Sequence, residues 1–271
     1  MLQNLLEGKR GIITGALDEN SIAWKVAVKA VEQGAKITLT NAPVAMRMGA
    51  IQKLAEQCNT IVIPADATSL EDLEKLYTDS MDHLGGKLDF VLHSIGMSPN
   101  VRKGKPYTDL NYDFLQKTYD ISAVSLHKMI QTAYKLDAVN DWGSFLALSY
   151  IAAQRIFPDY GDMADAKSLL ESIARGWGYH YGKKSKVRVN TISQSPTKTT
   201  AGSGVGGFDA FFDYADMLSP LGNASSEACA NFCVFMFSDL SRMITMQNLY
   251  HDGGFSQMGI APEIVTQFSE K

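Results

Sequence analysis

Cysteine is scarce in this chain of 271 residues, which contains only Cys58, Cys229 and Cys233. An odd and sparse set fits a protein from a reducing compartment better than a disulfide framework. Cys229 and Cys233 lie one helical turn apart, but no histidine and no second cysteine pair follows in the register that a zinc site needs. We therefore expect no metal centre.

Long hydrophobic runs and an excess of positive charge are also lacking. No apolar stretch approaches the roughly 20 residues that a membrane-spanning helix needs. The N-terminus carries an acidic residue and lacks the long apolar core of a signal peptide. The net charge is −4 and the lysines form no long run, which argues against a nucleic-acid-binding protein. The sequence thus predicts a soluble, cytoplasmic protein without membrane insertion.

What the sequence does have is an alternation of short apolar runs with longer amphipathic segments. The predicted strands are Gly11–Thr14, Lys36–Thr40, Thr60–Pro64, Phe90–Ser94, Gly143–Ser149, Val187–Ser193 and Asn248–His251. The predicted helices are Ser21–Gln33, Ala45–Gln57, Leu70–Leu84, Tyr112–Leu136, Tyr160–Tyr181 and Ser225–Ser238. This alternation predicts an α/β fold, a Rossmann-like, doubly wound parallel sheet of about seven strands flanked by helices.

No internal repeat, linker or low-complexity tract divides the chain. Hydrophobic residues make up 45% of it, which is enough for one large core. We therefore expect residues 1–271 to form a single domain. Residues 195–208 differ from the rest, because they are rich in Gly, Ser and Thr and lack periodicity. They predict a flexible loop over a site.

The turn after the first predicted strand has the features of a dinucleotide site. Gly15 stands at the turn, and Ser21 and Ile22 open the following helix. A helix N-terminus offers free backbone N–H groups and a positive dipole to a pyrophosphate. The usual G-x-G-x-x-G string is absent, so an ordinary N-capped turn remains the alternative.

Residues at the ends of later strands favour the same site. Asp66 and Ala67 follow the third predicted strand, and Ser94, Ile95 and Gly96 close the fourth. In open α/β sheets, ligands bind beyond the carboxyl ends of the strands. These small or acidic residues suit an adenine, a ribose and a close approach of the backbone.

The end of the second predicted strand bears on which cofactor binds. An acidic residue there would bind the 2′-hydroxyl of the adenosine, and a basic residue would favour a 2′-phosphate. Asn41 and Ala42 are neither, and Arg47 follows a few residues later. We therefore favour NADH, with NADPH as the alternative.

Tyr160 and Lys167 lie seven residues apart at the start of a predicted helix. A helix turns by roughly 100° per residue, so both side chains would share one face, about 10 Å apart along the axis. A phenol with a nearby ammonium suits a reaction in which negative charge develops on a substrate oxygen. By itself the pair is a weak signal, because tyrosine and lysine are common on helix surfaces.

Taken together, these segments resemble the short-chain dehydrogenase/reductase superfamily. The closer resemblance is to its divergent branch, the enoyl-acyl-carrier-protein reductases of bacterial fatty-acid synthesis, and it covers nearly the whole chain. Ordinary members space the catalytic pair as Tyr-x3-Lys, whereas position 164 is Ala164 here and the lysine is Lys167. Ordinary members also have a serine where this chain has Tyr150. Both departures are typical of the enoyl reductases.

The resemblance implies NADH-dependent reduction of the trans-2 double bond of an enoyl thioester, the last step of each elongation cycle. The implied catalytic residues are Tyr150, Tyr160 and Lys167. The implied cofactor-binding residues are Gly15, Ser21, Ile22, Asp66, Ala67, Ser94, Ile95, Gly96, Lys167, Thr197 and Thr199. The implied substrate-binding residues are Ser98, Tyr150, Tyr160 and Met163. An apolar groove for the acyl chain is expected among Met97, Tyr150, Phe157, Met163, Phe208, Phe211 and Phe212.

The resemblance also implies a homotetramer and an acyl carrier protein as the partner that delivers the substrate. Two departures bear on this. The family often has Ala-Gly-Pro where this chain has Gln194-Ser195-Pro196. After Pro196 the chain has Lys198 but lacks the basic cluster that receives the carrier elsewhere. The alternative basic patches are Arg102, Lys103 and Lys105, and Lys183, Lys184 and Lys186, each of which could also be a solvated turn.

Two other functions stay open from the residues. One is a carbonyl or ketoacyl reductase of the same superfamily, against which the Tyr-to-Lys spacing argues. The other is a catalytically idle nucleotide-binding scaffold. The presence of both Tyr160 and Lys167 argues against the scaffold.

Overall fold

The computed structural model describes residues 4–47, 50–200, 202 and 207–269. Six parallel strands form one sheet in the order β2-β1-β3-β4-β5-β6. The strands are β1 (Arg10–Thr14), β2 (Lys36–Thr40), β3 (Leu88–His93), β4 (Val139–Ser149), β5 (Arg188–Gln194) and β6 (Asn248–His251). The order reverses between β1 and β3, and the crevice beyond the carboxyl ends of strands at such a point is where ligands bind in open α/β sheets.

The predicted strand Thr60–Pro64 is the main error in the predicted sheet. This segment runs beside β2 but forms a single bridge, between Val62 and Leu39. The Leu39 amide donates to the carbonyl of Ile61 at 3.1 Å, and the Ile63 amide donates to the carbonyl of Leu39 at 2.8 Å. Pro64 has no N–H group with which to continue a ladder. The described chain therefore has six strands rather than about seven.

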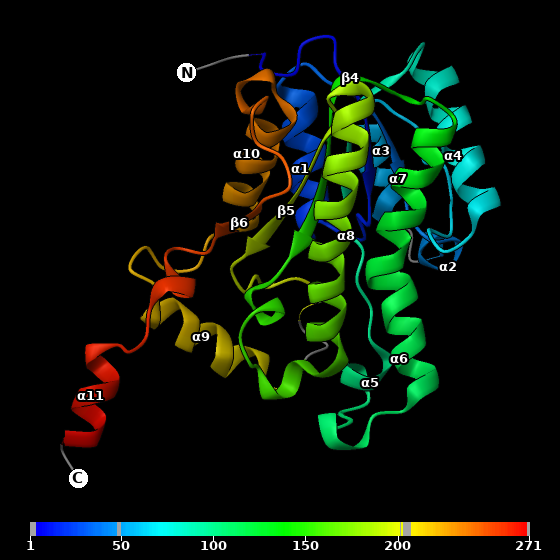
Figure 1. Ribbon diagram of the computed structural model, residues 1–271. Helices are drawn as coiled ribbons and strands as arrows, with labels where there is room; N and C mark the ends of the chain where they lie inside the picture. Colours follow the sequence, from blue (N-terminus) through cyan, green and yellow to red (C-terminus); the bar gives the residue numbers. More distant parts are fainter. Residues whose placement is uncertain (1–3, 48–49, 201, 203–206, 270–271) are drawn as a thin grey trace.

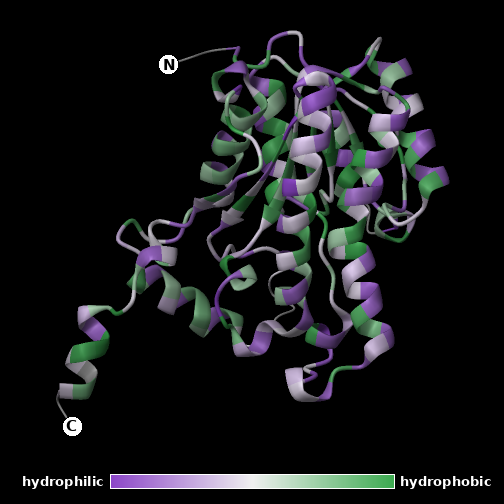
Figure 2. Ribbon diagram, in the orientation of Figure 1, coloured by the Kyte–Doolittle hydropathy of each residue, from purple (hydrophilic) through white to green (hydrophobic). Residues whose placement is uncertain are grey.

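Helices cover both faces of the sheet (Figure 1). They are α1 (Ile22–Glu32), α2 (Pro43–Met46), α3 (Ala50–Gln57), α4 (Leu70–Leu84), α5 (Pro99–Arg102), α6 (Tyr112–Tyr119), α7 (Ser125–Lys135), α8 (Gly161–Ser185), α9 (Phe208–Leu218), α10 (Ser226–Phe237) and α11 (Pro262–Ser269). On one face α1, α3 and α10 bury an apolar core against the sheet. On the other face α4, α7 and α8 bury a second core. In Figure 2 the apolar residues gather toward the sheet. None of the described helices is both long and apolar enough to span a membrane.

Helix boundaries agree with the sequence where a local stop or start signal exists. Ser69 caps α4 by accepting a hydrogen bond from the Asp72 amide at 3.2 Å, and Ser225 caps α10 in the same way. Gly34, which follows α1, has a φ of +92°, a conformation that glycine adopts at little cost.

The helices of the structure differ from the predicted ones at several places, among them α5 and α11, which were not predicted. The predicted helix over 112–136 contains a π-helical segment, Asp120–Val124, between α6 and α7. The predicted helix over 45–57 is divided into α2 and α3. Helix α9 lies in a stretch for which the sequence predicted no helix. These differences arise because tertiary packing overrides weak local preferences.

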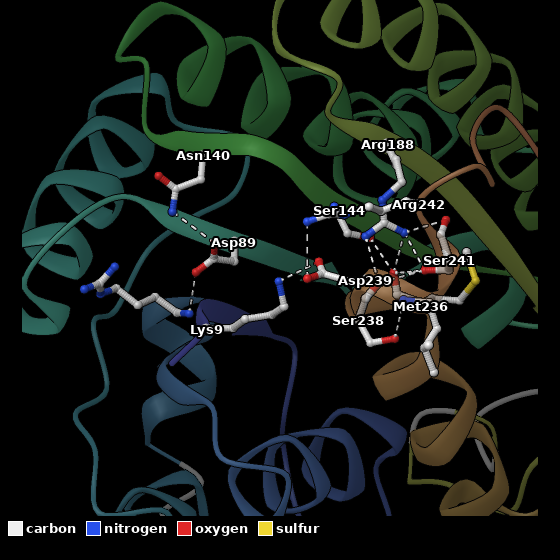
Figure 3. Close-up of polar contacts among 12 residues, drawn as sticks. Lys9, Asp89, Asn140, Ser144, Arg188, Met236, Ser238, Asp239, Ser241 and Arg242 are labelled. Carbon is white, nitrogen blue, oxygen red and sulfur yellow. Dashed lines mark hydrogen bonds and ion pairs between the residues drawn. The ribbon is translucent and has the colours of Figure 1, made fainter. Parts of the chain in front are cut away.

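The sheet end away from the carboxyl termini of the strands holds a buried cation (Figure 3). Arg188 begins β5 and is 2% exposed. Its guanidinium donates to the carbonyls of Met236 at 2.9 Å and Ser241 at 3.1 Å, at and just beyond the end of α10. The last carbonyls of a helix have no intrahelical donor and carry partial negative charge. Arg188 therefore caps α10 and joins it to the sheet.

Candidate active site

A cavity of about 850 Å³ opens beyond the carboxyl ends of the strands. It is lined by every residue that the sequence assigned to catalysis, cofactor or substrate, namely Gly15, Ser21, Ile22, Asp66, Ala67, Ser94, Ile95, Gly96, Ser98, Tyr150, Tyr160, Met163, Lys167, Thr197 and Thr199. The structure thus brings these side chains together, while the role of each remains a prediction.

The turn between β1 and α1 leaves room for a dinucleotide. Gly15 has a φ of +81°, and a Cβ atom there would lie 1.9 Å from the carbonyl oxygen of Ser94. Only glycine fits such a close approach. Ser21 makes no capping bond to α1, and the first turn of α1 has no acidic residue. The first turn of α1 therefore carries no acidic residue of its own to neutralise the helix dipole, which fits a pyrophosphate.

The other strand ends on this side hold polar groups that are already engaged. The Asp66 carboxylate accepts bonds from the amide and hydroxyl of Thr68, at 2.8 and 2.7 Å. Asn41 donates to the carbonyl of Ala16 at 2.9 Å. Asp66 thus shapes its own turn, whereas Asn41 joins the end of β2 to the turn after β1. Arg47 is not among the described residues that line the cavity, so it does not stand where it would select a 2′-phosphate.

The structure corrects the expected placement of Tyr160. A short 3₁₀ turn, Pro158–Tyr160, precedes α8, and Gly161 has a φ of +48°. Tyr160 therefore stands just before the helix rather than on its face. Helical periodicity is therefore not the reason that Tyr160 and Lys167 line the same cavity. The turn at Gly161 directs Tyr160 into the same cavity instead.

Tyr150 lies against Tyr160, with ring centroids 5.2 Å apart. The Tyr150 hydroxyl is buried and has no hydrogen-bond partner among the described residues. A buried donor without a partner costs free energy unless a ligand satisfies it. Burial raises the pKa of both phenols, so both are neutral at neutral pH. Each can therefore donate a hydrogen bond to a bound substrate.

Lys167 supplies the cation of the site. Its side chain is buried, and Nζ donates to the carbonyl of Leu148 at 2.7 Å. Burial lowers the pKa of Lys167 to about 8, and the carboxyl of Glu171 one turn later opposes this shift. A Cβ atom on Gly96 would lie 3.9 Å from Nζ and 3.8 Å from the Met163 side chain. The ammonium thus lies beside a strand end at which a glycine leaves space.

Ser98 was expected to contact the substrate, but its hydroxyl is already bonded to other groups of the protein. Its hydroxyl donates to the Asp162 carboxylate at 2.6 Å and accepts from the Val101 amide at 3.0 Å. Asp162 is fully buried and also accepts from Asn100 at 2.8 Å and from Thr118 at 2.9 Å. Sequence reasoning missed Asp162, because an acid in the first turn of a helix is usually a solvated partner of the helix dipole.

Aromatic side chains form one wall of the cavity. Phe157 lies 5.3 Å from the Tyr150 ring and 5.1 Å from the Phe211 ring. Of the residues predicted for the acyl groove, all but Phe212 line the cavity. Phe212 lies under Lys198, whose Nζ is 4.4 Å from the ring centroid. The expected flexible loop, 195–208, includes residues 201 and 203–206, which lie outside the described chain.

The comparisons with known proteins show the family to which the chain belongs. A family model described as enoyl-(acyl carrier protein) reductase matches residues 15–256. The chain belongs to this family. It is 33% identical to enoyl-acyl-carrier-protein reductase (NADH) 1 of Rhizobium meliloti, over 96% of each chain. It is 34% identical to the corresponding FabI enzyme of Rickettsia bellii, over 96% of this chain and 98% of that one.

Solved structures of FabI proteins superpose closely on the chain. The FabI–NADH complex from Alistipes finegoldii has a TM-score of 0.94 and 66% identity, and the match covers 95% of this chain and 91% of that one. The enoyl-acyl-carrier-protein reductase (NADH) of Aquifex aeolicus has a TM-score of 0.86 and 31% identity, covering 94% and 99%.

Within this reductase family, the chain differs from the expected Ala-Gly-Pro at the end of β5. Gln194 is 4% exposed and lines the cavity. Its side-chain oxygen lies 2.7 Å from Nδ1 of His251, and its amide donates to the carbonyl of Ala224 at 3.0 Å. The longer side chain thus ties the base of the loop that begins at Ser195 to β6 and to the segment before α10.

Proposed function

We propose that this reductase catalyses the NADH-dependent reduction of the trans-2 double bond of an enoyl-acyl-carrier-protein, giving the saturated acyl thioester. The observation that carries this proposal is the convergence of Tyr150, Tyr160 and Lys167 on one cavity in a chain of this family. Two neutral phenols and a cation suit the stabilisation of an enolate oxygen. The relatives' names specify NADH and the enoyl-acyl-carrier-protein substrate.

The cofactor site follows from the residues at the strand ends. Gly15, Ser21 and Ile22 would hold the pyrophosphate, Asp66 and Ala67 would contact the adenine, and Ser94, Ile95 and Gly96 would lie along the dinucleotide. Thr197 and Thr199 would cover it. NADH, when bound, supplies the hydride. Because Arg47 does not line the cavity and so does not favour a 2′-phosphate on the adenosine, we favour NADH over NADPH.

The chain's own groups would act on the thioester. Tyr160 would donate a hydrogen bond to the thioester carbonyl and hold the oxygen as negative charge develops there. Tyr150, with its unpartnered hydroxyl, would stand beside the same thioester. Lys167 would bind ribose hydroxyls and keep positive charge near the oxygen, and Met163 and Phe211 would contact the acyl chain. Ser98 would act through its bond to Asp162 rather than through a direct contact.

We further propose a homotetramer that works in the cytoplasm and receives its substrate from acyl carrier protein. The support is the family to which the chain belongs. Several apolar side chains are exposed in the single chain, among them Ile156 and Leu221, at 91% and 88%. Such side chains suit burial between copies.

The first experiment is to measure oxidation of NADH, and separately of NADPH, with a crotonyl or dodecenoyl thioester. Loss of absorbance with NADH is expected. Activity with NADPH alone would keep the reaction and overturn the assignment of the cofactor. Cofactor binding without turnover would move the function to a ketoacyl substrate or to a scaffold.

A further inference from the structure

Helix α5 and the residues just after it carry three cations, one of which lies at the cavity. Arg102, Lys103 and Lys105 are all exposed, and Arg102 lines the cavity. Lys103 lies 4.3 Å over the ring of Phe114, and Lys105 pairs with Asp109 at 3.6 Å. The Arg102 amide donates to the carbonyl of Ser98 at 3.1 Å, but its side chain makes no hydrogen bond or ion pair within the described chain. Its guanidinium is therefore free to receive an anion.

The position of Arg102 is set by buried contacts beneath it. The side chain of Asn100 donates to Asp162 at 2.8 Å and to the carbonyl of Asn111 at 3.1 Å. Val101 also lines the cavity, and a Cβ atom on Gly161 would lie 3.4 Å from its Cγ2 atom. Gly161 follows Tyr160, and Val101 lies next to Gly161. Arg102, the next residue along the chain, is therefore close to the turn that holds Tyr160.

The opposite side of the cavity has the other sign of charge. Helix α9 exposes Asp209, Asp213 and Asp216 and contains no lysine or arginine. Lys198, which precedes α9, is covered on one side by Phe212. An acidic partner is therefore repelled by α9 and attracted to α5. Because the whole chain carries a net charge of −4, an acidic partner needs a local cationic surface of this kind.

We propose that Arg102, Lys103 and Lys105, termed here the cationic rim, are the docking surface for the acidic acyl carrier protein. Arg102 stands at the cavity and binds the phosphodiester of the carrier's thioester arm, which a guanidinium can hold through two parallel hydrogen bonds. This inference rests on the proposed function. It places the carrier on α5 rather than on the loop and helix that follow β5.

The test compares two substrates with the same acyl group. Crotonyl-acyl carrier protein carries the acidic protein and the phosphate, whereas crotonyl-N-acetylcysteamine carries neither. In Arg102→Ala we expect kcat/KM for the carrier substrate to fall about tenfold, mainly through KM, and in Arg102→Glu about a hundredfold. The small thioester should react at an unchanged rate with both variants.

A matched control removes one exposed lysine from another part of the surface. Lys183 lies near the end of α8, whereas α5 lies at the start of that helix (Figure 1). Lys183→Ala should leave kcat/KM unchanged for both substrates. Higher ionic strength should raise KM for the carrier substrate in the unmodified enzyme and have less effect in Arg102→Ala.

The possible outcomes separate this inference from the proposed function. If the Arg102 variants lose kcat/KM equally with both thioesters, Arg102 has a structural or catalytic role and the docking surface is overturned. Unchanged kinetics with the carrier substrate would overturn it as well. An unmodified enzyme that reduces neither thioester would refute the proposed function itself, and the docking surface with it.

Discussion

The hydroxyl of Ser98 donates a 2.6 Å hydrogen bond to the buried carboxylate of Asp162, two residues after Tyr160. Together with Asn100 and Thr118, this bond joins α5 and α6 to the first turn of α8. The charge of Asp162 is compensated by three neutral donors rather than by a cation. The same contacts fix the position of Tyr160 relative to the α5 wall of the cavity.

Asp162→Asn should weaken this junction, because an amide brings N–H groups toward donors that need an acceptor. We expect the free energy of unfolding to fall by about 1–3 kcal/mol. We also expect kcat to fall about tenfold or more with the affinity for NADH retained, because a misplaced catalytic group loses rate steeply. Denaturant titration and steady-state kinetics measure both effects.

Asp165→Asn provides the matched control one turn along α8. Asp165 accepts longer bonds, at 3.2 Å from Tyr107 and 3.3 Å from Tyr119, and the oxygen of an asparagine can replace it as acceptor. We expect a loss of stability below about 1 kcal/mol and near-normal turnover. Equal effects of the two substitutions would contradict a special role for Asp162.

Tyr150→Phe is expected to change stability, and Tyr160→Phe is expected to change turnover. The Tyr150 hydroxyl is buried without a partner in the described chain, so its removal should leave the unliganded protein equally stable or more stable by up to about 1 kcal/mol. Tyr160→Phe should lower turnover by about 10²–10⁴-fold with near-normal NADH binding, because acid catalysis and oxyanion stabilisation are lost. Unchanged turnover in Tyr160→Phe would exclude Tyr160 as the donor.

The rate should depend on pH through Lys167. Burial lowers its pKa to about 8, so the ammonium loses its proton as pH rises through that value. The positive charge near the substrate oxygen is therefore nearly complete well below pH 8, halved near pH 8 and lost progressively as pH rises further. We expect kcat/KM to decline on the alkaline side with an apparent pKa of about 8.

Lys167→Arg tests the origin of this decline, because a guanidinium stays charged across the range. Even with a lower rate, this variant should show a flat profile between about pH 7 and 9.5. An alkaline decline that persists in Lys167→Arg would assign the titration to another group.

The buried cation at the far end of the sheet should contribute more to stability than the partly exposed Lys9 close to it (Figure 3). Arg188→Met removes the charged donor from the carbonyls of Met236 and Ser241, which keep bonds from the Ser144 and Ser241 hydroxyls and from the Ile244 amide. We expect a loss of about 2–4 kcal/mol, because the hydrogen bonds of a buried charged group are lost. Lys9→Met removes the ion pair with Asp239, which is 53% exposed, and should cost less than about 1 kcal/mol. Calorimetry of both variants measures the difference, and a reversed order would refute the capping role of Arg188.

Local signals in the sequence determined most of the sheet and the residues of the candidate site. Short apolar runs marked all six observed strands, because buried parallel strands need apolar residues on both faces. The glycine at position 15 marked the close turn, since only a residue without a Cβ atom fits there. The spacing of Tyr160 and Lys167, read with the surrounding motifs, indicated the enoyl reductase family.

Only the tertiary structure decided how these residues meet. The break at Gly161, the burial of Asp162 and the exposure of Arg102 on the cavity all depend on segments distant in sequence. Thr60–Pro64 looks like a strand because it is apolar, yet its single bridge to Leu39 depends on a neighbour that the local pattern does not specify. Periodicity reports which residues prefer burial, whereas the partner that buries them is set by packing across the whole chain.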